Sequence, residues 1–252
     1  MIDKFRIGTS GWNYDHWRGR FYPASLPTSR WFEHYCGVFD TVEINNTFYQ
    51  LPEAKTFDHW REQAPAGFAY ALKANRYLTH MKKLKDPAQP LRRFLGRARR
   101  LREHLGPILY QLPPGWKRNV QRLCEFCDAL PSNLTHVFEF REPDWLADET
   151  FAVLEAHGAC LCIHDLLDRH PRRVTGLTAY IRFHGSGQLY GGHYPRERLR
   201  RWADWICEAA SHTRTVFAYF NNDADAAAVR DAITLRELVS KSWSWRRATR
   251  TG

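Results

Sequence analysis

The sequence lacks any apolar run that approaches the ~18 residues needed to cross a bilayer. No apolar stretch follows the charged residues at positions 1–6, so a secretion signal is not expected either. No segment rich in Gly, Ser or Pro divides the 252 residues. The 44 % of apolar residues is enough to bury a substantial core. We therefore expect one domain, located in the cytoplasm.

The six cysteines show no disulfide framework, because all lie within apolar segments, as reduced core thiols do. Cys124 and Cys127 have the short spacing of a zinc or redox pair. No second pair or Cys/His partner follows at finger-like distance. Positions three apart share one helix face, so burial is favoured over metal binding.

Positive charge is in excess, with a formal net charge of +10, and most of the excess is local. Between Lys82 and Arg102, nine basic residues stand against one acid, Asp86, which gives this segment a charge of +8. A compact basic patch attracts nucleic acid or a small phosphorylated substrate, and its charge alone does not distinguish them.

Strand-like runs rich in β-branched and aromatic residues alternate with amphipathic helical runs, the pattern of repeated βα units. The count predicts a single-domain α/β fold, a (β/α)8 TIM barrel over residues 1–240, with a basic and flexible tail over 241–252. The crossover at 165–176 is short and basic, so we expect it to be irregular. Strands are expected at 5–10, 41–46, 68–74, 108–112, 136–141, 159–164, 179–184 and 216–221, and helices at 29–39, 53–64, 88–105, 119–130, 147–157, 195–211 and 223–239.

The clearest helix is expected over 88–105, where apolar residues recur at intervals of three and four and arginines occupy the other face. Gly106 and Pro107 follow. They predict a left-handed cap and a residue that cannot continue the helix.

Polar residues cluster where the predicted strands end. In a β/α barrel these carboxyl ends open onto one face, where barrel enzymes place their reacting groups. Alternation along a strand gives residues two apart the same face, so Glu139 and Arg141 are expected to point inward together. We predict catalytic roles for Glu43, Lys73, Glu139 and His184, and substrate binding by Asn45, Asn46, Gln111, Arg141, Asp165, Arg182, Tyr219, Asn221 and Asn222.

These segments resemble the YecE-like family, catalogued as domain of unknown function 72 (DUF72), over residues 6–238. The resemblance implies a barrel related in shape to sugar isomerases and to endonucleases that cut beside abasic sites, and it implies no established reaction. A glycine is expected where the chain has Ala224, Asp225 and Ala226, and the tail beyond Val239 lies outside the family pattern. The matching motifs are GTSGW (8–12), FYP (21–23), VEINNTFY (42–49), LP (51–52), LKANR (72–76), TH (79–80), QLPP (111–114), EFR (139–141) with Trp145, RFHG (182–185) and YFNND (219–223).

The predicted pocket carries alternative interpretations. Glu43 and Glu139 could act as a general acid and base, or could simply pair with Lys73, Arg141 and Arg182. For Lys73, ion pairing or phosphate binding is favoured over a Schiff base. A divalent metal held by acidic and histidine residues is not favoured, because three cations share the site. The metal ligands weighed were Glu43, Glu139, His164, Asp165 and His184.

Two hypotheses of function follow. The first is an enzyme of hydrolase or isomerase type, without a predicted cofactor, that acts on a small anionic or phosphorylated substrate. A dehydrogenase is not expected, because no G-x-G-x-x-G fingerprint follows the first strand. The alternative is a protein that binds or processes nucleic acid and resembles the endonuclease IV-like barrels. No membrane partner is expected, and no oligomeric state is predicted.

Overall fold

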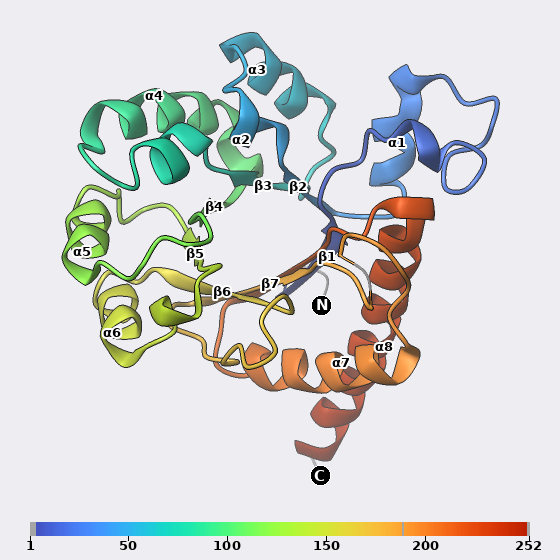
Figure 1. The fold of residues 1–252 in the computed structure, drawn as a ribbon. Coiled ribbons are helices and arrows are strands. Elements are labelled where there is room, and N and C mark those ends of the chain that lie inside the picture. Colours follow the sequence, from blue (N-terminus) through green and yellow to red (C-terminus); the bar gives the residue numbers. More distant parts are fainter. Residues whose placement is uncertain (1–3, 188, 251–252) are drawn as a thin grey trace.

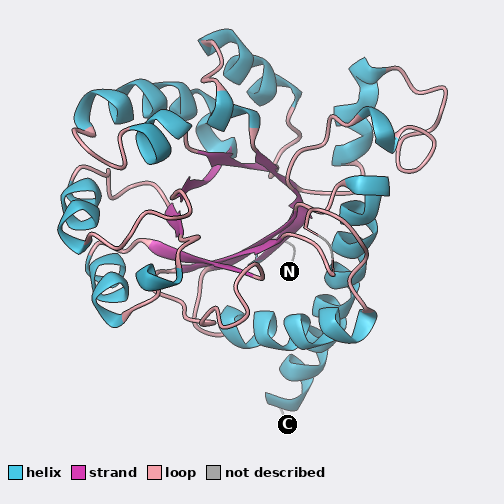
Figure 2. Ribbon diagram, in the orientation of Figure 1, coloured by secondary structure: helices cyan, strands magenta, loops and turns pink. Residues whose placement is uncertain are grey.

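The computed structural model describes residues 4–187 and 189–250. Eight parallel strands lie side by side in the order β1-β8-β7-β6-β5-β4-β3-β2, and helices cover the outside of this ring (Figures 1 and 2). The predicted (β/α)8 barrel is confirmed. Its strands are β1 (Phe5–Thr9), β2 (Thr41–Ile44), β3 (Ala69–Lys73), β4 (Leu105–Gln111), β5 (His136–Glu139), β6 (Cys160–His164), β7 (Thr178–Phe183) and β8 (Thr215–Phe220).

The barrel closes between β1 and β2, the two strands at the ends of that order. An isolated parallel bridge joins Ser10 to Glu43, and the Gly11 amide donates to the Glu43 carbonyl oxygen at 2.8 Å. Glu43 therefore lies at the seam of the barrel, on the side where the strands end.

Helices follow the strands as predicted, with bounds that differ by a few residues for most of them. Four short elements were not predicted. They are α2, directly after β2, a π-helical turn after β3, η4 (Tyr77–Met81), and two 3-10 turns, η2 (Asp15–Trp17) and η6 (Pro143–Trp145). None of the described helices is long and apolar enough to cross a bilayer. The α-helices are α1 (Trp31–Cys36), α2 (Asn46–Tyr49), α3 (Ala54–Gln63), α4 (Ala88–Ala98), α5 (Val120–Asp128), α6 (Asp148–Ala156), α7 (Arg196–Ala210) and α8 (Ala227–Arg250).

The end of the helix expected over 88–105 was predicted wrongly. Regular α-helix stops at Ala98, and the following η5 (Arg99–His104) contains Arg102 at a positive φ of 52°. Gly106 is not a helix cap but part of β4. A Cβ atom there would lie 3.0 Å from the Tyr70 carbonyl oxygen, so the glycine lets β4 approach β3 closely.

The last helix is longer than predicted. α8 crosses residue 240 without a break and continues to Arg250, where the sequence suggested a tail. The Trp243 ring packs edge-on against Phe5 with ring centroids 5.2 Å apart, and Ser242 Oγ donates to Asp204 at 3.1 Å. These contacts hold a polar, weakly periodic segment on the barrel. Residues 251 and 252 of the predicted tail lie outside the described part.

The crossover from β6 to β7 has no helix between residues 165 and 177, so the predicted irregular connection is confirmed. His170 lies in this connection, and its ring packs edge-on against His164 with centroids 4.4 Å apart. The connection therefore crosses the end of β6.

Side chains alternate between two cores, as the period of a strand requires. The outer core fills the space between sheet and helices. It contains Phe138 and Phe140, which were predicted to face the helices, and Phe140 stacks on Trp145 with centroids 5.1 Å apart. The inner core lies inside the barrel and consists of Ala71, Leu109, Val137, Cys160, Cys162, Tyr180, Phe217 and Tyr219.

Candidate active site at the barrel mouth

The last inward-facing positions of four strands carry charge. Glu43 on β2 and Glu139 on β5 are both fully buried, Arg182 on β7 is 1 % exposed, and Lys73 on β3 is 9 % exposed. Each lies two residues beyond an inward position of the same strand. The predicted gathering of these four side chains at the mouth is therefore present in the structure.

Arg182 links the two carboxylates. Its Nη1 donates to Glu139 Oε2 at 2.6 Å, while its Nη2 and Nε donate to Glu43 Oε1 at 2.8 and 3.1 Å. Tyr180 and Ser10 also donate their hydroxyls to Glu43, at 2.6 and 2.7 Å. Burial alone would lower the pKa of Arg182, but the two carboxylates outweigh it and raise that pKa well above its usual range.

Glu139 is held from a second side by Arg141, whose Nε donates to Glu139 Oε1. Burial would raise the pKa of this carboxyl. The positive charges of Arg141 and Arg182 outweigh burial and hold the pKa well below its usual range. Glu139 is therefore ionised near neutral pH. Of the two alternatives for the mouth carboxylates, ion pairing with Arg141 and Arg182 is present in the structure, and a catalytic role stays a prediction.

His184 faces both guanidinium groups through one nitrogen. Its Nε2 lies 3.1 Å from Arg141 Nη2 and 3.3 Å from Arg182 Nη1. Guanidinium groups only donate hydrogen bonds, so Nε2 must accept and the proton must lie on Nδ1. Burial lowers the pKa of His184, which agrees with a neutral ring. Asp165 faces Nδ1 at 3.6 Å and accepts from the His184 amide at 2.9 Å.

Lys73 is the exception among the charged groups. Within residues 4–187 and 189–250 its ammonium has no hydrogen bond or ion pair, and it lies 4.2 Å from the centre of the Phe48 ring. Burial, and then the positive charge of Arg182, lower its pKa from 10.5 to about 8. Of the two roles expected for Lys73, ion pairing is not formed among the described residues, because arginines already bind both nearby carboxylates. Phosphate binding stays a prediction.

Three amide side chains predicted to bind substrate follow β2 or end β4. The Asn45 side-chain oxygen is buried without a hydrogen-bond partner among the described residues, and Asn46 is exposed at the first position of α2. Gln111 is 8 % exposed, and its Nε2 makes only a long contact, 3.5 Å, with the Leu112 carbonyl oxygen. Asn45 and Gln111 therefore retain polar atoms that a ligand can use.

The predicted residues of β8 and the loop after it lie differently. Tyr219 is fully buried in the inner core, where its hydroxyl bonds Thr41 Oγ1 at 2.6 Å. Asn222 Nδ2 donates to Gly192 O and to Asp231 Oδ2, both at 2.8 Å, and so ties the loop after β7 to α8. Asn221 is half-buried and bonds Phe183 through its backbone.

Sequence reasoning missed three side chains that belong to this network. Tyr180 binds Glu43, and Tyr194 donates its hydroxyl to Asp165. His80 packs edge-on against Phe48 at 4.9 Å, and burial and then Lys73 lower its pKa to about 4. Tyr180 could have been found from alternation, because it lies two residues before Arg182. His80 lies in the unpredicted turn η4 and Tyr194 in a loop, where no periodicity places a side chain.

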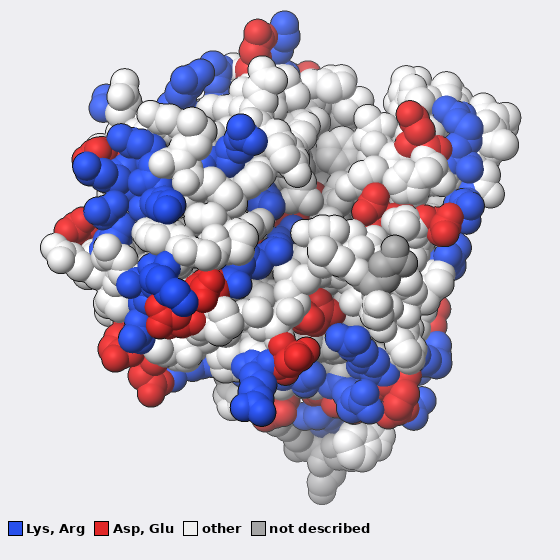
Figure 3. Space-filling view, in the orientation of Figure 1, with Lys and Arg blue, Asp and Glu red and all other residues white. Residues whose placement is uncertain are grey.

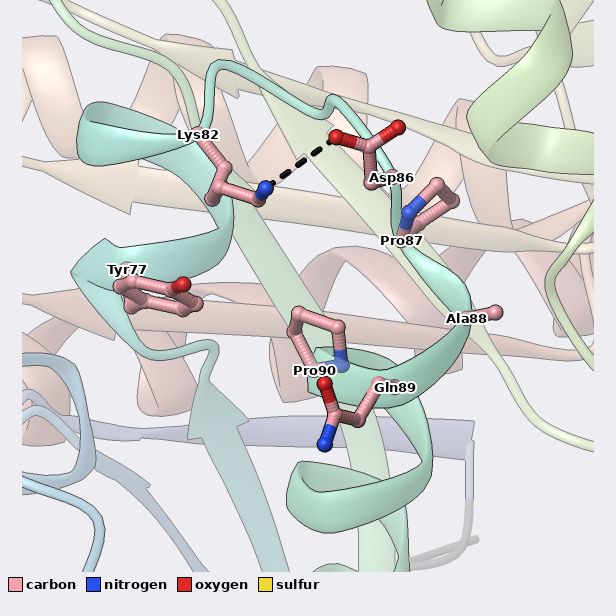
Figure 4. A pocket seen from close by; sticks show the side chains of 7 residues that line it. All are labelled: Tyr77, Lys82, Asp86, Pro87, Ala88, Gln89 and Pro90. Atoms are coloured by element: carbon pink, nitrogen blue, oxygen red, sulfur yellow. Dashed lines mark hydrogen bonds and ion pairs between the residues drawn. The ribbon is translucent and has the colours of Figure 1, made fainter.

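A cavity of about 430 Å³ opens beside the loop after β3, between η4 and the start of α4 (Figure 4). Lys82 and Asp86 face each other across it with an ion pair of 3.2 Å. Lys83, Leu84 and Asp86 all have positive φ, so this loop is strained. A larger cavity, of about 1110 Å³, lies where β1–β3 begin, against the second half of α8.

Among the described residues, no three of the candidate metal ligands at the mouth have ligand atoms close enough together to share an ion. Across the described ranges, one group of three His, Cys, Asp or Glu side chains lies close enough to share an ion, and it is Cys124, Asp128 and His157, on the outer helices. His164 uses Nε2 to bond the Phe140 carbonyl oxygen at 2.8 Å.

Comparison with known proteins gives the family. The profile of the family described as "Protein of unknown function DUF72" matches residues 6–251. The expectation that the segment beyond Val239 lies outside the family pattern was therefore wrong for nearly all of that segment. The chain is 22 % identical to the UPF0759 protein YunF of Bacillus subtilis, over 94 % of this chain and 95 % of that protein.

Comparison with solved structures supports the same family. A DUF72 family protein from Thermotoga maritima superposes with a TM-score of 0.86 at 26 % identity, over 94 % of this chain and 99 % of that one. A DUF72 family protein from Enterococcus faecalis gives a TM-score of 0.80 at 17 % identity, over 94 % and 95 % of the two chains. The chain therefore belongs to the DUF72 family.

Proposed function

We propose that the barrel mouth is the active site of an enzyme that transfers a proton to or from a small anionic substrate, in an isomerase- or hydrolase-type reaction. One observation carries the proposal: Lys73 is a nearly buried ammonium group that has no anionic partner within the described part of the chain, beside carboxylates that are already neutralised. The unpaired cation needs an explanation that the fold does not supply.

The charge balance of the mouth favours an anionic ligand. The carboxylates of Glu43 and Glu139 face the guanidinium groups of Arg182 and Arg141, which leaves the charge of Lys73 in surplus. A buried charge without a partner is costly. A phosphate or carboxylate group of a substrate would supply the missing partner and relieve that cost.

Proton transfer is best assigned to Lys73. The two roles of Lys73 belong to its two protonation states: the ammonium form binds the anion, and the neutral amine form accepts the substrate proton. A pKa of about 8 gives both forms useful populations near physiological pH, and general bases work best with a pKa near the working pH. Glu139, in contrast, is held ionised by two arginines, so we assign it to positioning Arg141 and Arg182. Glu43 and His184 complete this rigid frame.

The unpartnered oxygen of Asn45 narrows the substrate class. Asn45 follows β2, the neighbour of the strand that ends in Lys73, and its buried side-chain oxygen receives no hydrogen bond from any residue that the structure describes. Buried polar groups are normally satisfied. A substrate hydroxyl would donate to it, so we propose a hydroxylated anion such as a sugar phosphate or a sugar acid.

Calorimetric titration with inorganic phosphate at low ionic strength tests the anion site. We expect saturable binding to the wild-type protein and at least about tenfold weaker binding to Lys73→Met, because the variant lacks the surplus charge. Lys117→Met, which removes an exposed lysine that pairs with Glu142, is the matched control. Equal affinities of the wild type and Lys73→Met would overturn the proposal.

Exchange of substrate protons with solvent tests the chemistry. Small hydroxylated ketones and aldehydes that carry phosphate or carboxylate would be incubated with the protein in D2O and followed by NMR. Deuterium should enter the carbon next to the carbonyl with the wild type and not with Lys73→Met. Exchange at equal rates in both proteins would exclude Lys73 as the base.

Nucleic acid binding is the second candidate, and the charge beside the mouth favours it. Seven of the nine cations between Lys82 and Arg102 form no ion pair within the described ranges, and blue side chains gather over α4 in Figure 3. Affinity for a DNA or RNA oligonucleotide should fall steeply with salt and should drop in Arg92→Glu/Arg93→Glu. No binding at low salt would end this idea. The seven are Lys83, Lys85, Arg92, Arg93, Arg97, Arg99 and Arg102.

We also propose that the protein works in the cytoplasm. All six cysteines are free thiols in the structure, and thiols stay reduced in that compartment.

A further inference from the structure

Three side chains outside the barrel mouth bring metal-binding atoms together. Cys124 and Asp128 lie four positions apart on α5, and therefore on one face of that helix. His157 directly follows α6, the neighbouring helix in Figure 1. One ligand atom from each of the three residues lies within 4.8 Å of the other two. Thiolate, carboxylate and imidazole together form a donor set that zinc prefers.

The histidine is oriented as metal-binding histidines are. His157 Nδ1 lies 2.8 Å from the Val153 carbonyl oxygen and donates to it, because a carbonyl can only accept. Nε2 therefore points toward Asp128, at 2.9 Å from Oδ1. A backbone carbonyl that fixes one ring nitrogen while the other faces the ion is the usual second-shell arrangement.

The backbone around the cluster also favours a cation. Asp128 is the last residue of α5, and His157 follows the last residue of α6, so two helix C-termini meet here. Neither helix has Lys or Arg in its last turn. The C-terminal end of a helix carries partial negative charge, so Asp128 is unfavourable there without a nearby cation. In a chain with a net charge of +10, this is a locally electronegative site.

We propose that Cys124, Asp128 and His157 bind one divalent transition-metal ion of the zinc class, with water as the fourth ligand. The ion would clamp α5 to α6. Because helices in this fold run back from the mouth, their C-termini lie at the opposite end of the barrel from Lys73, and the site is independent of the proposed active site. The sequence alone did not indicate this site, because the residue that joins Cys124 there is not Cys127 but His157, which follows the next helix.

A proton competes with the metal for this site. Cys124 is a free thiol, and a thiol must lose its proton to bind a metal ion as a thiolate. Metal binding must therefore release protons from the site. Calorimetry in buffers of different ionisation enthalpy should show this proton release.

Cobalt titration of the full-length, reduced protein tests the proposal directly. Co²⁺ should produce a thiolate-to-cobalt charge-transfer band that saturates at one equivalent and disappears when Zn²⁺ is added. Cys124→Ser should lose the band, and His157→Gln should weaken Co²⁺ binding at least about tenfold. Cys36→Ser, which removes another half-buried free thiol, should retain both. A wild type without the band, or Cys124→Ser with it, would overturn the proposal.

Thermal unfolding guards against a variant that simply fails to fold. One equivalent of Zn²⁺ should raise the Tm of the wild type and of Cys36→Ser, because the metal binds only the folded state. It should leave the Tm of a folded Asp128→Asn/His157→Gln variant unchanged. A Zn²⁺-induced rise in that variant equal to the wild-type rise would also refute the site.

Discussion

Two layers of the barrel interior, built from the same strands, differ sharply in chemistry. Ala71, Val137 and Tyr180 are uncharged and lie in the inner core. Two residues further along the same strands stand Lys73, Glu139 and Arg182, all nearly or fully buried. The difference shows that this barrel can fill its interior with uncharged side chains, so its geometry does not require the charges at the mouth.

The comparison of the two layers distinguishes side chains that stabilise the fold from side chains that serve a function. Burying an ion pair costs desolvation energy that its own attraction often fails to offset, and apolar replacements are frequently as stable or more so. The inner core, two residues earlier on the same strands, shows that uncharged side chains can fill this barrel. We therefore infer that the upper layer is retained for a ligand. The following predictions test that inference, from the largest effect to the smallest.

Arg182→Met should have the largest effect. It leaves the buried carboxylates of Glu43 and Glu139 facing each other without their shared cation, and breaking a buried pair in this way costs about 3–5 kcal/mol. Urea unfolding at pH 7 measures the change. The variant that also carries Glu43→Gln and Glu139→Gln should recover much of the loss. A loss below about 1 kcal/mol, which is typical of an exposed ion pair, would contradict the account of two buried carboxylates that depend on one shared cation.

Leu109→Ala should lower the free energy of unfolding by about 2–5 kcal/mol, because it opens a cavity in the inner core. Phosphate affinity at the mouth should stay unchanged, since the charged layer is intact. The same unfolding and calorimetric measurements apply. Loss of phosphate binding in a folded Leu109→Ala protein would show that the two layers are not separable.

Lys73→Met should stabilise the protein at pH 7 by up to about 3 kcal/mol, because it removes a desolvated cation. The folded-state pKa, about 8, lies below the unfolded value near 10.5. The cost of Lys73 is thus complete below pH 8, and it fades as pH rises toward 10.5. Unfolding free energies at pH 7 and pH 10 measure this. A variant less stable than wild type at pH 7 would contradict it.

Ala226→Gly should have the smallest effect, at the rim of the mouth. Ala226 has a positive φ of 55°, a conformation that costs an L-residue about 1–2 kcal/mol. Glycine removes that strain but adds entropy to the unfolded chain, so we expect a net gain of about 1 kcal/mol or less. Thermal unfolding measures it. A lower Tm would show that the alanine methyl group contributes packing that outweighs the strain.

The eight strands could be predicted from runs of β-branched and aromatic residues that alternate with helical runs. The inward direction of Glu43, Glu139 and Arg182 could be predicted from the period of two along a strand. The pairing of Lys73 could not, since it depends on which carboxylates the arginines reach from other strands. The early break at Arg102 was missed because the apolar period continues through a kinked backbone. The Cys124 cluster was missed because its third member, His157, follows a different helix, and no local period relates residues on separate helices.

The side-chain pKa of Lys73 tests the central claim most directly. NMR of isotopically labelled lysine side chains, with the Lys73 signal identified by its absence in Lys73→Met, would follow its titration. We predict a midpoint at about 8 that moves upward when phosphate is added, because a bound anion stabilises the charged form. A midpoint near the ordinary 10.5, unmoved by phosphate, would contradict the account of an unpaired cation awaiting an anionic substrate.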